Sequence, residues 1–64
     1  MLRIREIRKA RGMTLAALAK IVNITPAALC RYEKGNRKPS IVMAFKIANA
    51  LGVTVDELFG RKAG

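Results

Sequence analysis

The sequence has no histidine, no tryptophan, a single cysteine and only four acidic residues among 64. One cysteine cannot form a disulfide within the chain, and without histidine no Cys/His zinc cluster is possible. General acid–base catalysis lacks its usual groups, because histidine is absent and carboxylates are scarce. These absences predict a protein that is not an enzyme and that has no metal or other cofactor.

Long hydrophobic runs are missing as well. No apolar run in the chain approaches the roughly 18 to 20 residues that cross a bilayer. The N-terminal stretch MLRIREIRKARG carries too many charges for the apolar part of a signal peptide. Because a chain without disulfides suits a reducing compartment, we expect a soluble cytoplasmic protein with no membrane contact and no evident small-molecule ligand.

What the chain does contain is positive charge. Thirteen lysines and arginines against four acidic residues give a net charge of +9, within one small domain that is 52% hydrophobic. Residues 1–38 hold ten of the basic and two of the acidic residues, whereas residues 39–60 hold one basic and two acidic residues. This division predicts one face for a polyanion and another for the core or a partner. The alternative is a basic soluble protein without a polyanionic partner.

Short helices account for the rest of the pattern, so the sequence predicts an all-α fold. Thr14, Thr25, Ser40 and Thr54 each stand where a side-chain oxygen would cap a helix, and Pro26 suits the first helical position. Apolar residues placed before Thr14, Thr25 and Thr54 and four residues after them have the spacing of a hydrophobic staple. The five helices are expected at about 2–11, 15–22, 26–33, 41–51 and 55–59. The expected core faces include Ile4, Ile7 and Ala10; Leu15, Leu18, Ala19 and Val22; Leu29 and Tyr32; Ile41, Ala44, Phe45, Ile47, Ala48 and Leu51; Val55, Leu58 and Phe59.

The second and third helices are separated by only three residues, which forces a sharp turn between them. This is the geometry of a helix-turn-helix, expected at about residues 15–34. Ala19 is small enough for the close crossing of the two helices, and Asn23 is the best residue after glycine for a positive φ in the turn.

The order of these features resembles the lambda-repressor-like, Cro-type helix-turn-helix family, also called the XRE family. The resemblance covers nearly the whole chain and rests on the segments IREIRKARGMT, LAKIVNIT, LCRYEKGNRKPS and KIANALGVTVDELFG. It implies a compact five-helix DNA-binding domain over residues 1–60, followed by a short basic tail at 61–64. It further implies a third helix in the major groove of double-stranded DNA and a homodimer on a near-palindromic operator. A protein of this kind is a small transcriptional regulator of bacterial or phage type, expected to repress and to lie at the nucleoid.

The resemblance also assigns roles to residues. Arg8 and Glu33 match a structural ion pair that ties the first helix to the third. The chain departs from the family pattern in two places. Leu15 stands where the family commonly has glutamine, and Pro26 and Ala27 stand where larger polar residues are common. The DNA-binding positions carried over from the family are Thr14, Leu15, Thr25, Pro26, Ala27, Ala28, Arg31, Lys34, Asn36, Arg37 and Lys38.

Several of these residues have two interpretations. Arg31 either contacts guanine, the commonest specific contact of arginine, or contacts phosphate or solvent. Ala27 and Ala28 either touch thymine methyl groups or are simply good helix formers. The basic loop at 34–38 either contacts phosphates or is a solvated turn. Cys30 is either a thiol switch or a small filler.

A second function is consistent with the same residues. Val42 and Met43 lie off the expected core stripe, so they form either a self-association surface or ordinary exposed surface. Because the third helix offers few polar side chains, the alternative to a regulator is an antitoxin-like accessory module that binds protein and touches DNA weakly. We expect no second, ligand-sensing domain, so regulation would come from the protein's own concentration or from a partner.

Overall fold

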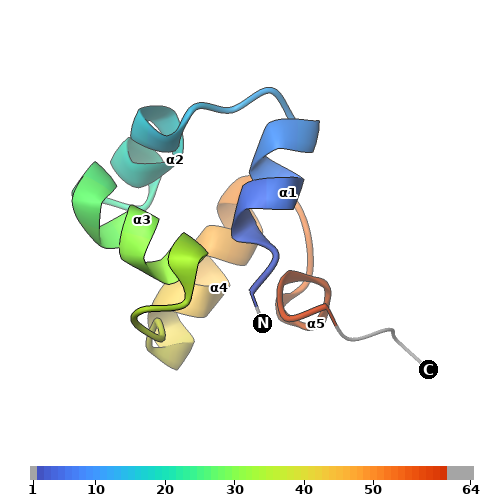
Figure 1. Cartoon of the computed structure of the whole chain (residues 1–64). Helices are drawn as coiled ribbons and strands as arrows, with labels where there is room; N and C mark the ends of the chain where they lie inside the picture. The colour runs from blue at the N-terminus through green and yellow to red at the C-terminus, as the bar shows by residue number, and fades with distance from the viewer. Residues whose placement is uncertain (1, 61–64) are drawn as a thin grey trace.

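The computed structural model of the chain describes residues 2–60, which form five helices and, within that range, no strand. The all-α fold predicted from the sequence is therefore confirmed. The helices are α1 (Ile4–Ala10), α2 (Leu15–Ile21), α3 (Pro26–Lys34), α4 (Ile41–Leu51) and α5 (Val55–Leu58). In Figure 1, α2 and α3 lie together on the left, α1 stands on the right, and α4 passes behind them toward α5. Among these residues, no helix is long and apolar enough to cross a membrane.

Three of the four connections end in the same three-residue pattern. The pattern is a residue of positive φ, then an apolar residue, then a capping threonine: Gly12-Met13-Thr14, Asn23-Ile24-Thr25 and Gly52-Val53-Thr54. The apolar residue donates its backbone N–H to a carbonyl in the last turn of the preceding helix, at 3.0 Å in all three cases. This bond is the Schellman pattern, and the threonine then starts the next helix.

The caps form as the sequence predicts. Thr14, Thr25, Ser40 and Thr54 each accept a hydrogen bond from the backbone N–H three residues later, at 3.1 Å. Thr54 and Glu57 make a full capping box. These bonds satisfy backbone groups that short helices would otherwise leave open, which matters in a domain with so small a core.

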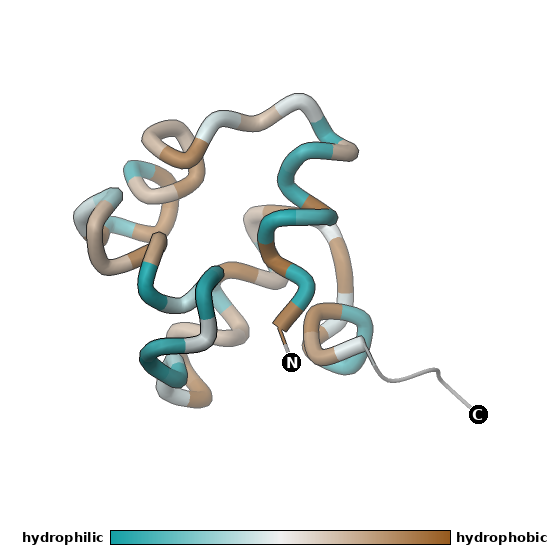
Figure 2. The backbone as a smooth tube through the Cα atoms, in the orientation of Figure 1, coloured by the Kyte–Doolittle hydropathy of each residue, from teal (hydrophilic) through white to brown (hydrophobic). Residues whose placement is uncertain are grey.

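The core lies where α4 meets α1, α2 and α5, and it is almost entirely aliphatic. The apolar residues that are completely or almost completely buried are Ile4, Leu18, Ala19, Val22, Leu29, Ala44, Ile47, Ala48, Leu51 and Leu58. Met13, Ile24 and Val53, the apolar residues of the three connections, are partly buried against this cluster. Figure 2 shows hydrophilic segments along the outside of α1 and after α3, whereas α4 is mostly hydrophobic.

Some helix ends differ from the expected bounds. The first helix starts at Ile4 rather than at residue 2. The backbone of Arg3 is not helical, because its N–H donates to the carbonyl of Leu58 at 2.8 Å. It ends at Ala10 and the second helix at Ile21, one residue early, since Arg11 and Val22 are the C-cap residues. The third helix runs one residue longer, to Lys34, and the fifth ends at Leu58 rather than at 59.

Four residues expected in the core are exposed: Ala10, Ile41, Phe45 and, at 37%, Phe59. Ala10 is exposed, because α1 ends there and only its earlier turns pack on other helices. Ile41 and Phe45 are exposed to 77% and 55%, since the outward side of the first turns of α4 meets no other helix of residues 2–60. Met43, by contrast, is partly buried against the core, whereas Val42 is 64% exposed as expected.

Candidate nucleic-acid interface

Helix α3 is fixed at both ends and along its inner side. Thr25 caps it through the N–H of Ala28, and Pro26 occupies the first helical position. Leu29 is fully buried in the core. Gly35 ends the helix with a φ of +78°, a conformation that favours glycine, and its N–H returns to the carbonyl of Tyr32. The helix therefore cannot roll about its axis without breaking the core.

An ion pair also ties α3 to α1. Arg8 Nε lies 2.8 Å from Glu33 Oε2, and a second guanidinium nitrogen donates to Oε1 at 3.2 Å. The third nitrogen of Arg8 donates to the carbonyl of Met13 at 2.9 Å. The two side chains are only 11% and 7% exposed. The ion pair implied by the family resemblance is thus present. Two guanidinium nitrogens bind the carboxylate of Glu33 in a bidentate contact, and the third is held by the carbonyl of Met13.

The outer side of α3 exposes a narrow stripe of side chains. Ala27, Arg31 and Lys34 are exposed and follow one another at spacings of four and three residues, so they share one face. Thr25 and Pro26 are also exposed, whereas Ala28 and Cys30 are half-buried at the edges of this face. Lys34 was expected in the following loop but belongs to the last turn of α3.

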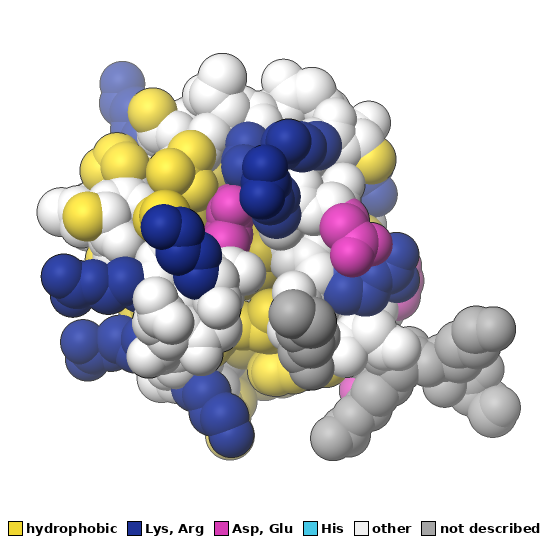
Figure 3. All heavy atoms as spheres, in the orientation of Figure 1, with side chains coloured by type: hydrophobic (Ala, Val, Ile, Leu, Met, Phe, Trp, Pro, Cys, Tyr) yellow, Lys and Arg dark blue, Asp and Glu magenta, His cyan; other side chains and the backbone are white. Residues whose placement is uncertain are grey.

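The connection from α3 to α4 is the one that departs from the three-residue pattern. It is longer, and Asn36, Arg37 and Lys38 in it are all exposed between Gly35 and the half-buried Pro39. Figure 3 shows lysine and arginine side chains projecting along the side of the molecule where α3 and this loop lie. The structure therefore brings the exposed stripe of α3 and the basic loop onto one side.

The start of α2 holds the remaining expected residues. Thr14 is exposed, and its hydroxyl oxygen is engaged in capping. Leu15 is half-buried and packs against the core, which accounts for an apolar residue at this position.

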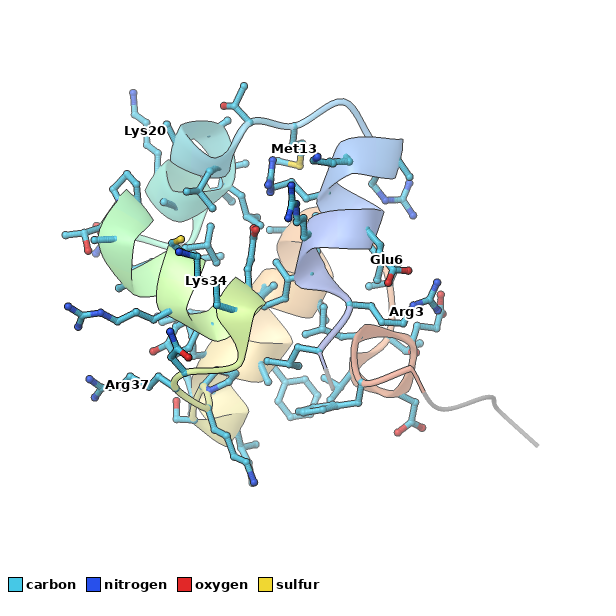
Figure 4. The ribbon with its side chains drawn as sticks, in the orientation of Figure 1. Arg3, Glu6, Met13, Lys20, Lys34 and Arg37 are labelled. Carbon is cyan, nitrogen blue, oxygen red and sulfur yellow. The ribbon has the colours of Figure 1, made fainter. Side chains whose placement is uncertain are left out.

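Lys20 was not among the expected site residues. It is exposed in the last turn of α2 and, like Arg37, points away from the core on the side where α3 lies (Figure 4). The signal was present in the sequence, because Lys20 is the only charged residue of the helix LAALAKI.

Comparison with known proteins shows which family shares this geometry. A helix-turn-helix family model, HTH_3, matches residues 4–58, which is most of the chain. The chain belongs to the HTH_3 helix-turn-helix family. The resemblance seen in the sequence is therefore confirmed. An HTH-type transcriptional regulator from Archaeoglobus fulgidus, itself uncharacterised, is 40% identical over 57 residues, which span 89% of this chain and 81% of that protein.

Solved structures of DNA-bound proteins share this fold. SinR, a master regulator for biofilm formation crystallised in complex with DNA, superposes with a TM-score of 0.81 at 31% identity, over 89% of this chain and 92% of SinR. The P22 c2 repressor, in complex with a synthetic operator, superposes with a TM-score of 0.82 at 30% identity, over 88% of this chain and 85% of the repressor. Both are DNA-bound regulators, so the five-helix arrangement found here is one that DNA-binding proteins use.

Proposed function

We propose that this protein binds double-stranded DNA sequence-specifically and regulates transcription, repressing a promoter by occupying it. The observation that carries the proposal is the exposed stripe of α3 beside the basic loop at 36–38, on a helix immobilised by the core and by the Arg8–Glu33 pair. Similarity to SinR and to the P22 c2 repressor supports it. With DNA as its target, we expect the protein to act in the cytoplasm, at the nucleoid.

The residues divide into two roles. Arg31 and the first turn of α3 at 25–28 face the base edges, where sequence is read. The phosphate-facing set supplies register and most of the salt-dependent affinity. This set comprises Thr14, Lys34, Asn36, Arg37 and Lys38, to which we add Lys20. Leu15 has no donor for phosphate, so its role is to pack α2 against the core beside Thr14.

We further propose that the protein acts as a homodimer on a near-palindromic operator. Ile41, Val42 and Phe45 are 77%, 64% and 55% exposed, which is unusual for three large apolar residues within two turns of one helix. A second copy covering this side of α4 would remove them from water and pair two reading helices with two half-sites. Residues 1–60 form the DNA-binding unit in this proposal; the basic tail at 61–64 lies outside the described residues.

One observation favours a second function. The first turn of α3 carries only small apolar side chains after Thr25, as expected for a helix that contributes little to base recognition. In that case the protein is an antitoxin-like or accessory module, with the apolar side of α4 binding another protein and DNA bound weakly.

Selection of bound duplexes from random DNA at physiological salt distinguishes the two. The regulator predicts a short enriched consensus with two-fold related halves. Recovery of unenriched random sequence, with binding governed only by salt, would contradict the regulator and leave the accessory module.

A further inference from the structure

The side chains of the first turn of α3 offer few hydrogen-bonding groups to a base. The hydroxyl oxygen of Thr25 accepts from the N–H of Ala28 at 3.1 Å, and Pro26 has no N–H to donate. The side chains of Ala27 and Ala28 end in methyl groups. Adenine is read by asparagine or glutamine, guanine by arginine or lysine, and cytosine by an acidic side chain. None of these side chains stands in this turn, so the only side chain there that can hydrogen-bond to a base is Thr25, through its O–H.

We infer that the first turn of α3 reads the C5-methyl groups of thymines, while Arg31 reads a guanine further along the groove. The inference rests on the proposed function. Among the four bases, only thymine presents a methyl group in the major groove, and alanine is one of the side chains that contacts it. Ala27 is exposed on the same stripe as Arg31, so it is the residue placed to make this contact.

The spacing of the stripe sets the spacing of the bases. Ala27 and Arg31 are four residues apart, which is about 6 Å along a helix axis. Base pairs are about 3.4 Å apart along DNA, so a helix following the groove places the two contacts roughly two base pairs apart. Each half-site should therefore contain one or more thymines and a guanine about two steps away.

A competing explanation assigns the alanines no contact with a base. In that view they are small only so that α3 can approach the groove closely, and specificity comes from Arg31 and from DNA shape. Replacing thymine by deoxyuridine separates the two explanations, because it deletes the methyl group and leaves every hydrogen-bonding group of the base pair unchanged.

The experiment starts from the duplex that emerges from selection on random DNA. Each thymine of a half-site is replaced singly by deoxyuridine, and each guanine by 7-deazaguanine, which lacks the N7 acceptor. We expect about fourfold weaker binding at the contacted thymine, equivalent to losing one buried methylene group. We expect about fivefold or greater loss at the guanine read by Arg31. That second loss should disappear in Arg31→Ala.

Ala16 provides a matched control for Ala27. Both are exposed alanines at the second position of a helix whose threonine cap bonds to the N–H of the third. Glycine at either position therefore has the same effect on helix stability. The loss of affinity caused by replacing thymine with deoxyuridine should vanish in Ala27→Gly and persist in Ala16→Gly.

The outcomes separate this inference from the proposed function. If selection yields no consensus, the proposed function fails and this inference fails with it. If a consensus emerges but no thymine responds to deoxyuridine, or the response is the same in Ala27→Gly and Ala16→Gly, methyl reading is refuted and sequence-specific binding stands.

Discussion

Arg8 and Glu33 lie 25 residues apart in the sequence and are joined by two hydrogen bonds in the fold. No local pattern connects them, because the spacing rules of a helix reach only three or four residues. Their pairing was implied only by the resemblance to the helix-turn-helix family. Since both side chains are nearly buried, removing one partner would leave the other charge without compensation.

We therefore expect Glu33→Ala to lower the free energy of unfolding by about 3 to 5 kcal/mol. That is comparable to the whole stability of so small a domain. Circular dichroism during thermal denaturation measures the change. The double variant Arg8→Met, Glu33→Met should be more stable than Glu33→Ala, because no charge remains buried.

Glu6 provides the control for this measurement. It pairs with Arg3 at 3.3 Å, but the two side chains are 50% and 70% exposed. Glu6→Ala should leave the melting temperature almost unchanged, because exposed ion pairs contribute little. Equal losses in Glu6→Ala and Glu33→Ala would contradict the anchoring role of the buried pair.

At the scale of the helices, the sequence predicted most of the architecture because the signals are local. The three repeated connections could be predicted, because their residue of positive φ, apolar residue and capping threonine are consecutive in the sequence. The start of α1 could not be predicted, because it depends on the backbone hydrogen bond from Arg3 to Leu58, which lies far along the chain. The exposure of Ile41 and Phe45 was missed for the same reason, since periodicity shows an apolar stripe but not which part of it meets another helix.

Asn23 gives a test at this scale. It is the only non-glycine residue of positive φ among residues 2–60, with φ +61°, in the turn between α2 and α3. Asn23→Ala should destabilise the protein by about 1 kcal/mol, because alanine lacks the short polar side chain that makes this conformation tolerable. Asn23→Gly should remain within about 0.5 kcal/mol of the parent, because its easier turn is offset by a more flexible unfolded chain. Urea denaturation measures both, and an Asn23→Ala variant as stable as Asn23→Gly would contradict this account of the turn.

At the scale of the whole molecule, most of the basic residues and most of the exposed large apolar residues lie in different halves of the chain. The basic loop and the outer side of α3 lie on one side, and three of the five exposed large apolar residues, Ile41, Val42 and Phe45, lie on α4. The other two within residues 2–60 are Ile21 on α2 and Phe59 after α5. The uneven distribution of charge was visible in the sequence and predicted a polyanionic partner. The sequence did not show which side of the fold carries the basic residues, because that depends on how α2, α3 and the loop are oriented relative to one another.

Arg37 and Lys46 test the charged side. Both are exposed basic residues, one in the loop after α3 and one on α4. Arg37→Ala should weaken binding to specific and random duplexes alike and reduce the slope of log K against log salt by about 0.9. Lys46→Ala should leave that slope unchanged. Equal effects of the two substitutions would mean that net charge, rather than the loop, determines affinity.

The exposed side of α4 yields a prediction about assembly. Phe45→Glu should convert a dimer into a folded monomer, because it places a charge in the surface that the second copy would bury. Sedimentation equilibrium gives the mass, and circular dichroism checks the helices. A wild-type protein that is monomeric both free and on its operator would contradict the homodimer.

Sequence-specific reading by α3 is tested most directly by one comparison. Fluorescence anisotropy at about 150 mM salt measures the affinity of the parent and of Arg31→Ala for the selected duplex and for a scrambled duplex of equal length. The parent should prefer the selected duplex by about a thousandfold or more. Arg31→Ala should lose about 1 to 3 kcal/mol on the selected duplex and much less on the scrambled one. An equal loss on both duplexes would show that Arg31 contacts phosphate alone and that α3 does not read sequence through it.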